Sequence, residues 1–392
     1  MTQPIDPVAY LKALIACPSV TPEEGGALVW MEEVLTGAGF KVDRVTFSAP
    51  DTPDVENLFA TIGRGAPHLV FAGHTDVVPP GDEAHWTHPP FAADIADGAV
   101  YGRGAVDMKG GIACFMAAAL DAVAAGSVPG TLSLLITGDE EGPSVNGTVK
   151  MLDWALEQGH RFDAALVGEP TSRQTLGDMI KIGRRGATSV TITVKGRQGH
   201  AAYPHLAENP ITRIVHILDR LARLHLDDGT QDFDRSNLEI TSVDVGNPAF
   251  NVIPGEANAK INVRFNDTWT LDTLEAHLQA EIAAAAEEAP GTGAIAFKRV
   301  RGSESFLTAP GALTEAISGA IEAVAGITPT PSTSGGTSDA RFFKGVCPVV
   351  EFGLVGDTMH QVDERVPLKD LEGLTAIYRA FIDRYYSGTG SA

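Results

Sequence analysis

The sequence predicts an α/β fold with a mixed sheet that is interrupted by a smaller α+β unit. Strand-length hydrophobic runs alternate with helical segments over about the first 180 residues, which is typical of α/β layered domains. From Gly183 the strand-like segments alternate strictly between apolar and polar residues, and from about Ser305 the α/β pattern of the first part returns. A chain of 392 residues is also long for a single core. We therefore expect one domain formed by residues 1–182 and 304–392, with residues 183–303 inserted into it.

The first 182 residues carry helical and strand-like segments in turn. Apolar positions at helical spacing or in long small-residue runs predict helices at Pro7–Cys17, Gly26–Ala38, Gly111–Ala125 and Thr148–Gln158. Alternating or continuous apolar runs predict strands at Lys41–Phe47, Leu58–Ile62, His68–Ala72, Thr131–Thr137 and Ala164–Val167.

The insert has a different order of elements. Its strands are predicted at Ala187–Lys195, Leu238–Val245, Ala257–Phe265 and Ala294–Arg301, and its helices at Ile211–Leu224 and Leu271–Glu288. The order strand–helix–strand–strand–helix–strand is that of a ferredoxin-like unit. The last part of the chain predicts, in order, the helix Ala312–Ala325, the strand Cys347–Phe352 and the helix Leu368–Tyr386.

Charge and composition exclude several functional classes. The chain has 50 acidic and 29 basic residues, and its net charge of −21 argues against binding to nucleic acid or to anionic membranes. The start, MTQPIDPVAY, lacks the basic and apolar regions of a signal peptide, and the most apolar segment is too short to span a bilayer. Cys17, Cys114 and Cys347 have neither disulfide nor zinc-finger spacing. We expect a soluble cytoplasmic protein with reduced thiols.

Polar residues follow the predicted strands where the strands end, which is where α/β folds usually place their sites. The set comprises His74, Asp76, Asp107, Glu140, Glu141, Glu169 and, late in the chain, His360. Imidazoles and carboxylates without thiolates suit Zn²⁺ or a similar divalent ion in a hydrolytic site. On an extended backbone His74 and Asp76 share a face, so Asp76 can accept from the ring N–H of His74.

Each of these residues has a plainer interpretation. Asp107, in the glycine-dense stretch Tyr101–Gly111, could cap the helix that follows. The adjacent Glu140 and Glu141 could form a solvated turn; in a metal site, one would bind an ion and the other would face the water. His85 and His88 could compete as ligands, but they lie outside the strand-end pattern. The joint occurrence of the set at successive strand ends favours the metal site.

A series of motifs makes the chain resemble a known family. They are HTDVVPPGD, YGRGAVDMKGG, GDEEG, GEP, GRRG, GHAAYPHLAENP, NVIP, SGGTSDARF and MHQVDE. Together they are similar to the dizinc deacylase family that holds acetylornithine deacetylase, aminoacylases and glutamate carboxypeptidases. The resemblance covers nearly the whole chain. It implies a zinc-peptidase-like catalytic domain with an inserted dimerisation or lid domain, and hence a homodimer.

The resemblance also implies roles for the strand-end residues. His74, Asp107 and Glu169 match the ligands of one zinc ion, and Asp107, Glu141 and His360 match those of the other, with Asp107 bridging. Asp76 matches the residue that orients His74, and Glu140 matches the general base. The peptide bond Asp107–Met108 is expected to be cis. Two zinc ions per subunit are implied, and cobalt is expected to substitute for them.

The motifs GRRG, GHAAYPHLAENP and SGGTSDARF are similar to those of members that release succinate from N-succinyl-L,L-diaminopimelate, in lysine and diaminopimelate biosynthesis. By the same resemblance, His200 reaches the active site of a partner subunit and stabilises the oxyanion. Because the substrate carries several carboxylates, we expect arginines near it, with Arg184 and Arg185 as alternatives within GRRG. The substrate-binding candidates are Arg184, Tyr203, Asn251, Arg264, Gly336, Thr337 and Arg341.

Three alternatives remain. A deacylase of the same family that acts on acetylornithine or another N-acyl amino acid would share the metal site and differ in the pocket. A non-catalytic binding protein on this scaffold would be expected to lack the base or a ligand, and this chain retains both. A dinucleotide-binding oxidoreductase is poorly supported, because Asp107 stands where the third glycine of the fingerprint that opens at Gly102 should be.

Overall fold

The computed structural model describes residues 5–388, which form two compact units. The first unit comprises the chain up to Ile182, Thr308–Ser332 and the chain from Ser338 onward. The second comprises Gly183–Leu307 and the short segment Thr333–Thr337. It thus extends beyond the expected range 183–303 at one end, and it takes in the short segment because Arg184 Nη1 donates to Ser334 O (3.4 Å) and Gly336 O (3.1 Å).

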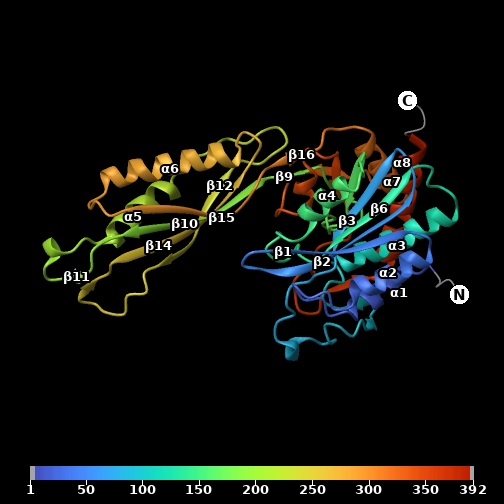
Figure 1. Ribbon diagram of the computed structural model, residues 1–392, viewed down its shortest axis with the longest axis horizontal. Helices are drawn as coiled ribbons and strands as arrows, with labels where there is room; N and C mark the ends of the chain where they lie inside the picture. Colours follow the sequence, from blue (N-terminus) through green and yellow to red (C-terminus); the bar gives the residue numbers. More distant parts are fainter. Residues whose placement is uncertain (1–4, 389–392) are drawn as a thin grey trace. The chain divides into compact units, whose positions relative to one another are not determined.

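An eight-stranded mixed sheet lies at the centre of the first unit (Figure 1), as the sequence predicted. Its order is β1 (Lys41–Ala49), β2 (Thr52–Gly63), β6 (Thr131–Thr137), β3 (His68–His74), β7 (Ala164–Val167), β18 (Val349–Glu351), β8 (Met179–Lys181) and β17 (Thr330–Ser332). Within this sheet, β6, β3, β7 and β18 are parallel to one another. A small antiparallel sheet joins β19 (Arg365–Pro367), β5 (Ala99–Tyr101) and β4 (Ile95–Ala96).

Helices cover both faces of the large sheet. They are α1 (Pro7–Ile15), α2 (Ala27–Gly37), α3 (Lys109–Ala124), α4 (Thr148–Glu157), α7 (Ala312–Ala325) and α8 (Leu368–Gly388), with 3₁₀ turns at η1 (Glu83–His85) and η3 (Asp339–Phe343). Alternation along β2 separates the two faces: Leu58 and Ala60 join the core with α3 and α8, whereas Phe59 contacts Trp154 of α4. This layering is that of an α/β domain.

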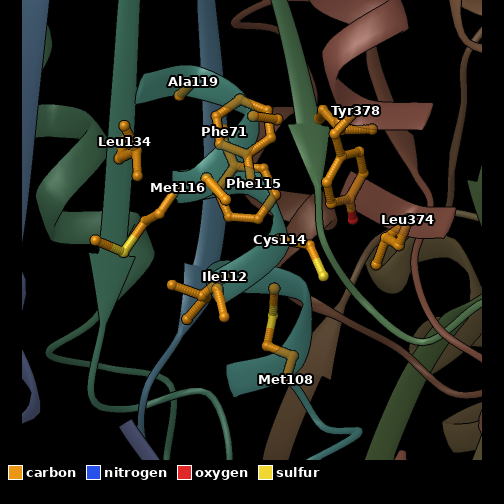
Figure 2. Packing of buried hydrophobic residues seen from close by; sticks show 14 of the residues in the cluster. Phe71, Met108, Ile112, Cys114, Phe115, Met116, Ala119, Leu134, Leu374 and Tyr378 are labelled. Atoms are coloured by element: carbon orange, nitrogen blue, oxygen red, sulfur yellow. The ribbon is translucent and has the colours of Figure 1, made fainter. Parts of the chain in front are cut away.

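The helix α3 is buried along almost all of its length (Figure 2). Phe115 stacks on Phe71 of β3 with ring centroids 4.0 Å apart, and Tyr378 of α8 meets both rings edge-on. The Tyr378 hydroxyl donates to Phe352 O at 2.6 Å, so its polar end is satisfied in the core. Small residues are needed at the start of α3, because a Cβ at Gly111 would collide with the carbonyl of Gly168.

The second unit contains a four-stranded antiparallel sheet in the order β12 (Asn237–Asp244), β14 (Glu256–Phe265), β10 (Gly186–Lys195) and β15 (Ile295–Ser303). The helices α5 (Pro210–Ala222) and α6 (Leu271–Glu288) pack on it. Two-residue strands form the pairs β9 (Gly183–Arg184) with β16 (Phe306–Leu307) and β11 (Gly199–His200) with β13 (Val252–Ile253), and η2 is Pro204–Leu206. The order of the long elements is the ferredoxin-like order that the sequence predicted.

The sequence did not predict β8, β17 or the small sheet. Each of these strands has three residues or fewer, so none of them shows a hydrophobic period. The three cysteines are free. Within residues 5–388, no helix combines the length and the apolar character needed to cross a membrane.

We predict that Phe115→Ala destabilises the first unit by about 3–5 kcal/mol, because it removes a fully buried ring that contacts both Phe71 and Tyr378. The free energy of unfolding in urea measures the effect. Val324→Ala, at an exposed position of α7, serves as the control and should change stability little. Equal effects of the two substitutions would contradict this packing.

Candidate metal centre

The sheet topology gathers the candidate ligands of the first unit. The strands β6, β3 and β7 are adjacent and parallel, so their carboxyl ends lie at the same edge. His74 is the last residue of β3, Glu140 and Glu141 follow β6, and Glu169 follows β7. Asp107 stands two residues before α3, whose close approach to Gly168 brings it to the same edge.

The Asp107 carboxylate lies between two imidazoles. Its Oδ1 is 3.2 Å from His74 Nε2, and its Oδ2 is 3.2 Å from His360 Nε2. Glu169 Oε1 is 3.6 Å from His74 Nε2, and Glu141 Oε1 is 2.8 Å from His360 Nε2. Each oxygen of Asp107 therefore belongs to a different half of the cluster, one with His74 and Glu169 and the other with His360 and Glu141.

The donor atoms fit divalent metal ions. Zinc bonds of about 2.0–2.2 Å to nitrogen and oxygen place tetrahedral ligand atoms roughly 3.3–3.6 Å apart, which is close to most of these separations. Two overlapping groups bring three candidate donor atoms within 4.8 Å: His74, Glu140 and Glu169, and His74, Asp107 and Glu141. We favour the division made by the two imidazoles, because it pairs each one with its nearest carboxylates. His and carboxylate donors without thiolate could hold zinc or a similar ion.

The cluster perturbs the proton affinity of its imidazoles. Burial alone would lower the pKa of His74, but hydrogen bonds to Asp107 and Asp76 raise it well above its usual value. Hydrogen bonds to Asp107 and Glu141 raise the pKa of His360 to about 10. Without a metal ion, these shifts favour the doubly protonated, cationic form of both imidazoles.

The carboxylates respond in opposite directions. Burial would raise the pKa of Asp107, but hydrogen bonds from His360 and His74 hold it well below its usual value. Burial raises the pKa of Glu140 to about 8, and nearby acidic groups add to the shift. Burial and the charge of Asp107 raise the pKa of Glu169. In the metal-free cluster, protons on the imidazoles and on Glu140 and Glu169 thus offset the negative charge that metal ions would otherwise neutralise.

Asp76 supports this cluster from within the core, where its side chain is fully buried. Its Oδ2 accepts from Thr21 Oγ1 at 2.6 Å and from the backbone N–H of Glu141 at 3.0 Å, and its Oδ1 accepts from that of Glu140 at 3.3 Å. His74 Nδ1 is 2.9 Å from the carbonyl of Asp76 and 3.5 Å from its carboxylate. The backbone of Asp76 is thus nearer to the imidazole than the carboxylate that was expected to orient it.

The sequence analysis missed Glu364, the acid that ends the motif MHQVDE. Its buried carboxylate accepts from the backbone N–H groups of Val106 (2.8 Å), Asp107 (3.2 Å) and Gly104 (3.1 Å). It also pairs with Arg103 Nη1 at 2.6 Å. Glu364 therefore ties the segment of His360 to the loop that presents Asp107. Its place in MHQVDE, four residues after His360, was the available signal. The peptide bond Asp107–Met108 is cis, as the resemblance implied.

The second unit brings together three of the other candidates. His200 and Tyr203 have ring centroids 5.6 Å apart, and the N–H of Ala201 donates to Asn251 O at 2.9 Å. All three side chains are exposed. They share one end of this unit with the β11–β13 pair.

The remaining candidates are divided between the units. Arg184 lies on β9 and Arg264 on β14, and Gly336 and Thr337 belong to the segment that joins the second unit. Arg341 lies in the first unit, with Nη2 3.5 Å from Asp339 Oδ1. Of the two competing histidines, His85 lies in η1 and His88 contacts Asp94 at 3.1 Å. Neither histidine belongs to the two groups of potential metal ligands found among the described residues.

The chain belongs to peptidase family M20/M25/M40, a family of metal-dependent hydrolases, because the model of this family matches residues 70–384. Several solved structures share its fold. A metallo-carboxypeptidase of the M20 family from Sulfolobus solfataricus is 17% identical, with a TM-score of 0.79 over 97% of this chain and 99% of that one. A tripeptidase from Staphylococcus aureus is 19% identical, with a TM-score of 0.79 over 97% and 98% of the chains.

A third structure is that of a Bacillus subtilis protein described as a dinuclear metal binding peptidase of the M20 family. It is 18% identical, with a TM-score of 0.71 over 98% of each chain. At these identities the likeness shows the fold, which is the fold that the sequence predicted.

We predict that zinc binding to the metal-free protein releases protons and tightens as pH rises from 6 to 9. The raised pKa of His74 and that of His360, about 10, favour the cationic imidazoles, and a metal ion must displace the extra protons. Glu140, with a pKa of about 8, becomes ionised within this range and adds attraction. Calorimetric titration in buffers of different ionisation enthalpy measures the released protons. Binding without proton release, and equally tight at pH 6 and 9, would contradict the geometry.

Proposed function

We propose that this chain is a dizinc amidohydrolase that cleaves N-succinyl-L,L-diaminopimelate to succinate and L,L-diaminopimelate, a succinyl-diaminopimelate desuccinylase. The observation that best supports this proposal is the position of the Asp107 carboxylate. Its two oxygens face the imidazoles of His74 and His360, in a chain of the M20 family. The motifs that resemble those of the desuccinylases support the substrate.

The proposed ligands of one ion are His74, Asp107 and Glu169, and those of the other are Asp107, Glu141 and His360. Bound divalent ions lower the pKa of a water molecule and polarise an amide carbonyl. Zinc is the proposed metal because the donors are imidazoles and carboxylates, and cobalt is expected to replace it.

Glu140 is the proposed general base. Its backbone N–H donates to Asp76, and the preceding strand β6 fixes its position at the sheet edge. In the metal-free cluster burial raises its pKa to about 8, and nearby cations would favour the ionised form that accepts a proton. Glu140 takes a proton from the attacking water as the oxygen bonds to the succinyl carbonyl carbon. It then gives that proton to the nitrogen of the leaving amine as the C–N bond breaks.

His200 is proposed as a donor to the oxyanion in the active site of a partner subunit. Its Nδ1 accepts the N–H of Ala202 at 3.0 Å, so the neutral ring carries its proton on Nε2 and can donate from there. A homodimer is further supported by exposed apolar side chains of the second unit, where Phe250 is fully exposed and Leu206 is 62% exposed.

Arginines support an anionic substrate in a chain that is acidic overall. Burial and the neighbouring charge of Arg185 lower the pKa of Arg264, so two cations lie close together in the second unit. Arg184, Arg264 and Arg341 are the proposed partners of substrate carboxylates, with Tyr203, Asn251, Gly336 and Thr337 as further contacts. An acetylornithine deacetylase would share the metal centre and differ in these contacts, so substrate comparison separates the two.

The direct test is succinate release from N-succinyl-L,L-diaminopimelate, run beside acetate release from N-acetylornithine, with zinc supplied and then chelated. We expect chelator-sensitive turnover of the succinyl substrate and at least about a hundredfold lower kcat/KM for acetylornithine, since buried partners of a missing carboxylate would be left unpaired. Preferential turnover of acetylornithine would keep the metal chemistry and overturn the substrate.

We predict that Glu140→Gln lowers kcat by about 10²–10⁴-fold while both zinc ions remain bound, because it removes proton transfer but no proposed ligand. The measurements are steady-state turnover and zinc content by atomic absorption. Glu372→Gln, at an exposed position of α8, is the matched control and should turn over normally. Undiminished turnover of Glu140→Gln would exclude this base.

A further inference from the structure

A groove of about 540 Å³ lies in the second unit. Figure 1 labels α5, α6 and β15, the elements that contribute to its lining. Its walls come from the carboxyl-terminal half of α6, from the loop after it and from β15, and α5 contributes one residue, Arg213. The apolar lining includes Ile282, Ala286, Ile295 and Phe297. The groove lies wholly in the second unit, whereas the candidate metal ligands all belong to the first.

Arg213 is the positively charged residue of this groove, and two of its guanidinium nitrogens lack hydrogen-bond partners. Its Nε and Nη1 atoms are buried and have no hydrogen-bond partner among the described residues. No ion pair of Arg213 within 4.0 Å is found there either, whereas Arg220, the other arginine of α5, pairs with Glu281. Buried donors without acceptors are costly, and a guanidinium presents its N–H groups as a fork that matches a carboxylate.

The nearby acid Glu208 does not fill this role. Its Oε1 accepts from the backbone N–H groups of Thr292 and Gly293, in the loop that lines the groove. Those two bonds, more than the charges of Arg197 and Arg213, lower the pKa of Glu208. Glu208 therefore shapes the loop and leaves the donors of Arg213 unmatched.

A second charge of opposite sign lines the same groove. Glu287 is exposed on α6, and among residues 5–388 it forms no ion pair, whereas its neighbour Glu288 pairs with Arg220. Arg213 and Glu287 do not pair with each other within 4.0 Å. A cation and an anion that share an apolar groove without pairing are complementary to a ligand that carries both charges on an aliphatic body.

We propose that this groove binds a small zwitterionic amino acid with an aliphatic side chain. Its carboxylate pairs with Arg213, its ammonium group with Glu287, and its side chain packs against Ile282, Ala286 and Phe297. None of the residues that line the groove is assigned to the proposed catalytic centre, and the proposal does not depend on the substrate assigned to that centre.

The test is calorimetric titration of L-norleucine into the full-length, zinc-loaded protein. Hexanoate, which lacks the ammonium group, and hexylamine, which lacks the carboxylate, are titrated in parallel. Norleucine should bind at least about tenfold more tightly than either, since each lost charge-assisted contact contributes roughly 1.5–3 kcal/mol. Hexanoate that binds as tightly as norleucine would overturn the zwitterion, and no binding of norleucine at millimolar concentration would overturn the site.

Variants separate this groove from any amino-acid binding at the metal centre. Arg213→Gln should weaken norleucine binding at least about tenfold. Arg223→Gln, at the residue that caps the carboxyl end of α5 and pairs with Asp219, is the matched control and should bind normally. Ala283→Phe places a ring in the groove from an exposed position of its wall and should abolish binding. It provides an independent test in case Arg213→Gln is unstable. Unchanged affinity in Arg213→Gln or in Ala283→Phe would overturn the proposal.

Discussion

The first unit is organised around one carboxylate that two imidazoles share. Asp107 contacts His74 through one oxygen and His360 through the other, and Glu169 and Glu141 complete the two halves. These residues come from distant parts of the chain and reach one place for separate reasons. Parallel strands bring His74 and Glu169 to one sheet edge, and a glycine contact between α3 and Gly168 brings Asp107 there.

Such a concentration of acids requires compensation, either by positive charge or by protonation of some of the carboxylates. In the metal-free protein the imidazoles keep their protons, and Glu140 and Glu169 have raised pKa values. Two acids beside the cluster are stabilised by backbone hydrogen bonds instead. Asp76 accepts from the backbone N–H groups of Glu140 and Glu141, and Glu364 accepts from the loop of Asp107. These carboxylates fix the backbone and leave the cluster free to exchange protons for metal ions.

The sequence predicted the strand-end residues because parallel strands end at one edge, whatever the details of the loops. It predicted α3 and the strands beside it because their apolar runs are long. Its motif MHQVDE was the available signal for Glu364, but the role of this residue was missed, since an acid in a loop shows no period and its three N–H partners are more than 250 residues away in the chain. It also assigned the orientation of His74 to the Asp76 carboxylate, whereas the carbonyl of the same residue lies closer. The roles of His200 and of the arginines remain predictions.

The central claim is that Asp107 bridges two metal ions. Anomalous diffraction at the zinc absorption edge, from crystals of the zinc-loaded protein, tests it most directly. The account predicts two peaks that flank the Asp107 carboxylate, one in contact with His74 and Glu169 and the other with His360 and Glu141. A single peak, or a pair in which only one ion touches Asp107, would contradict it.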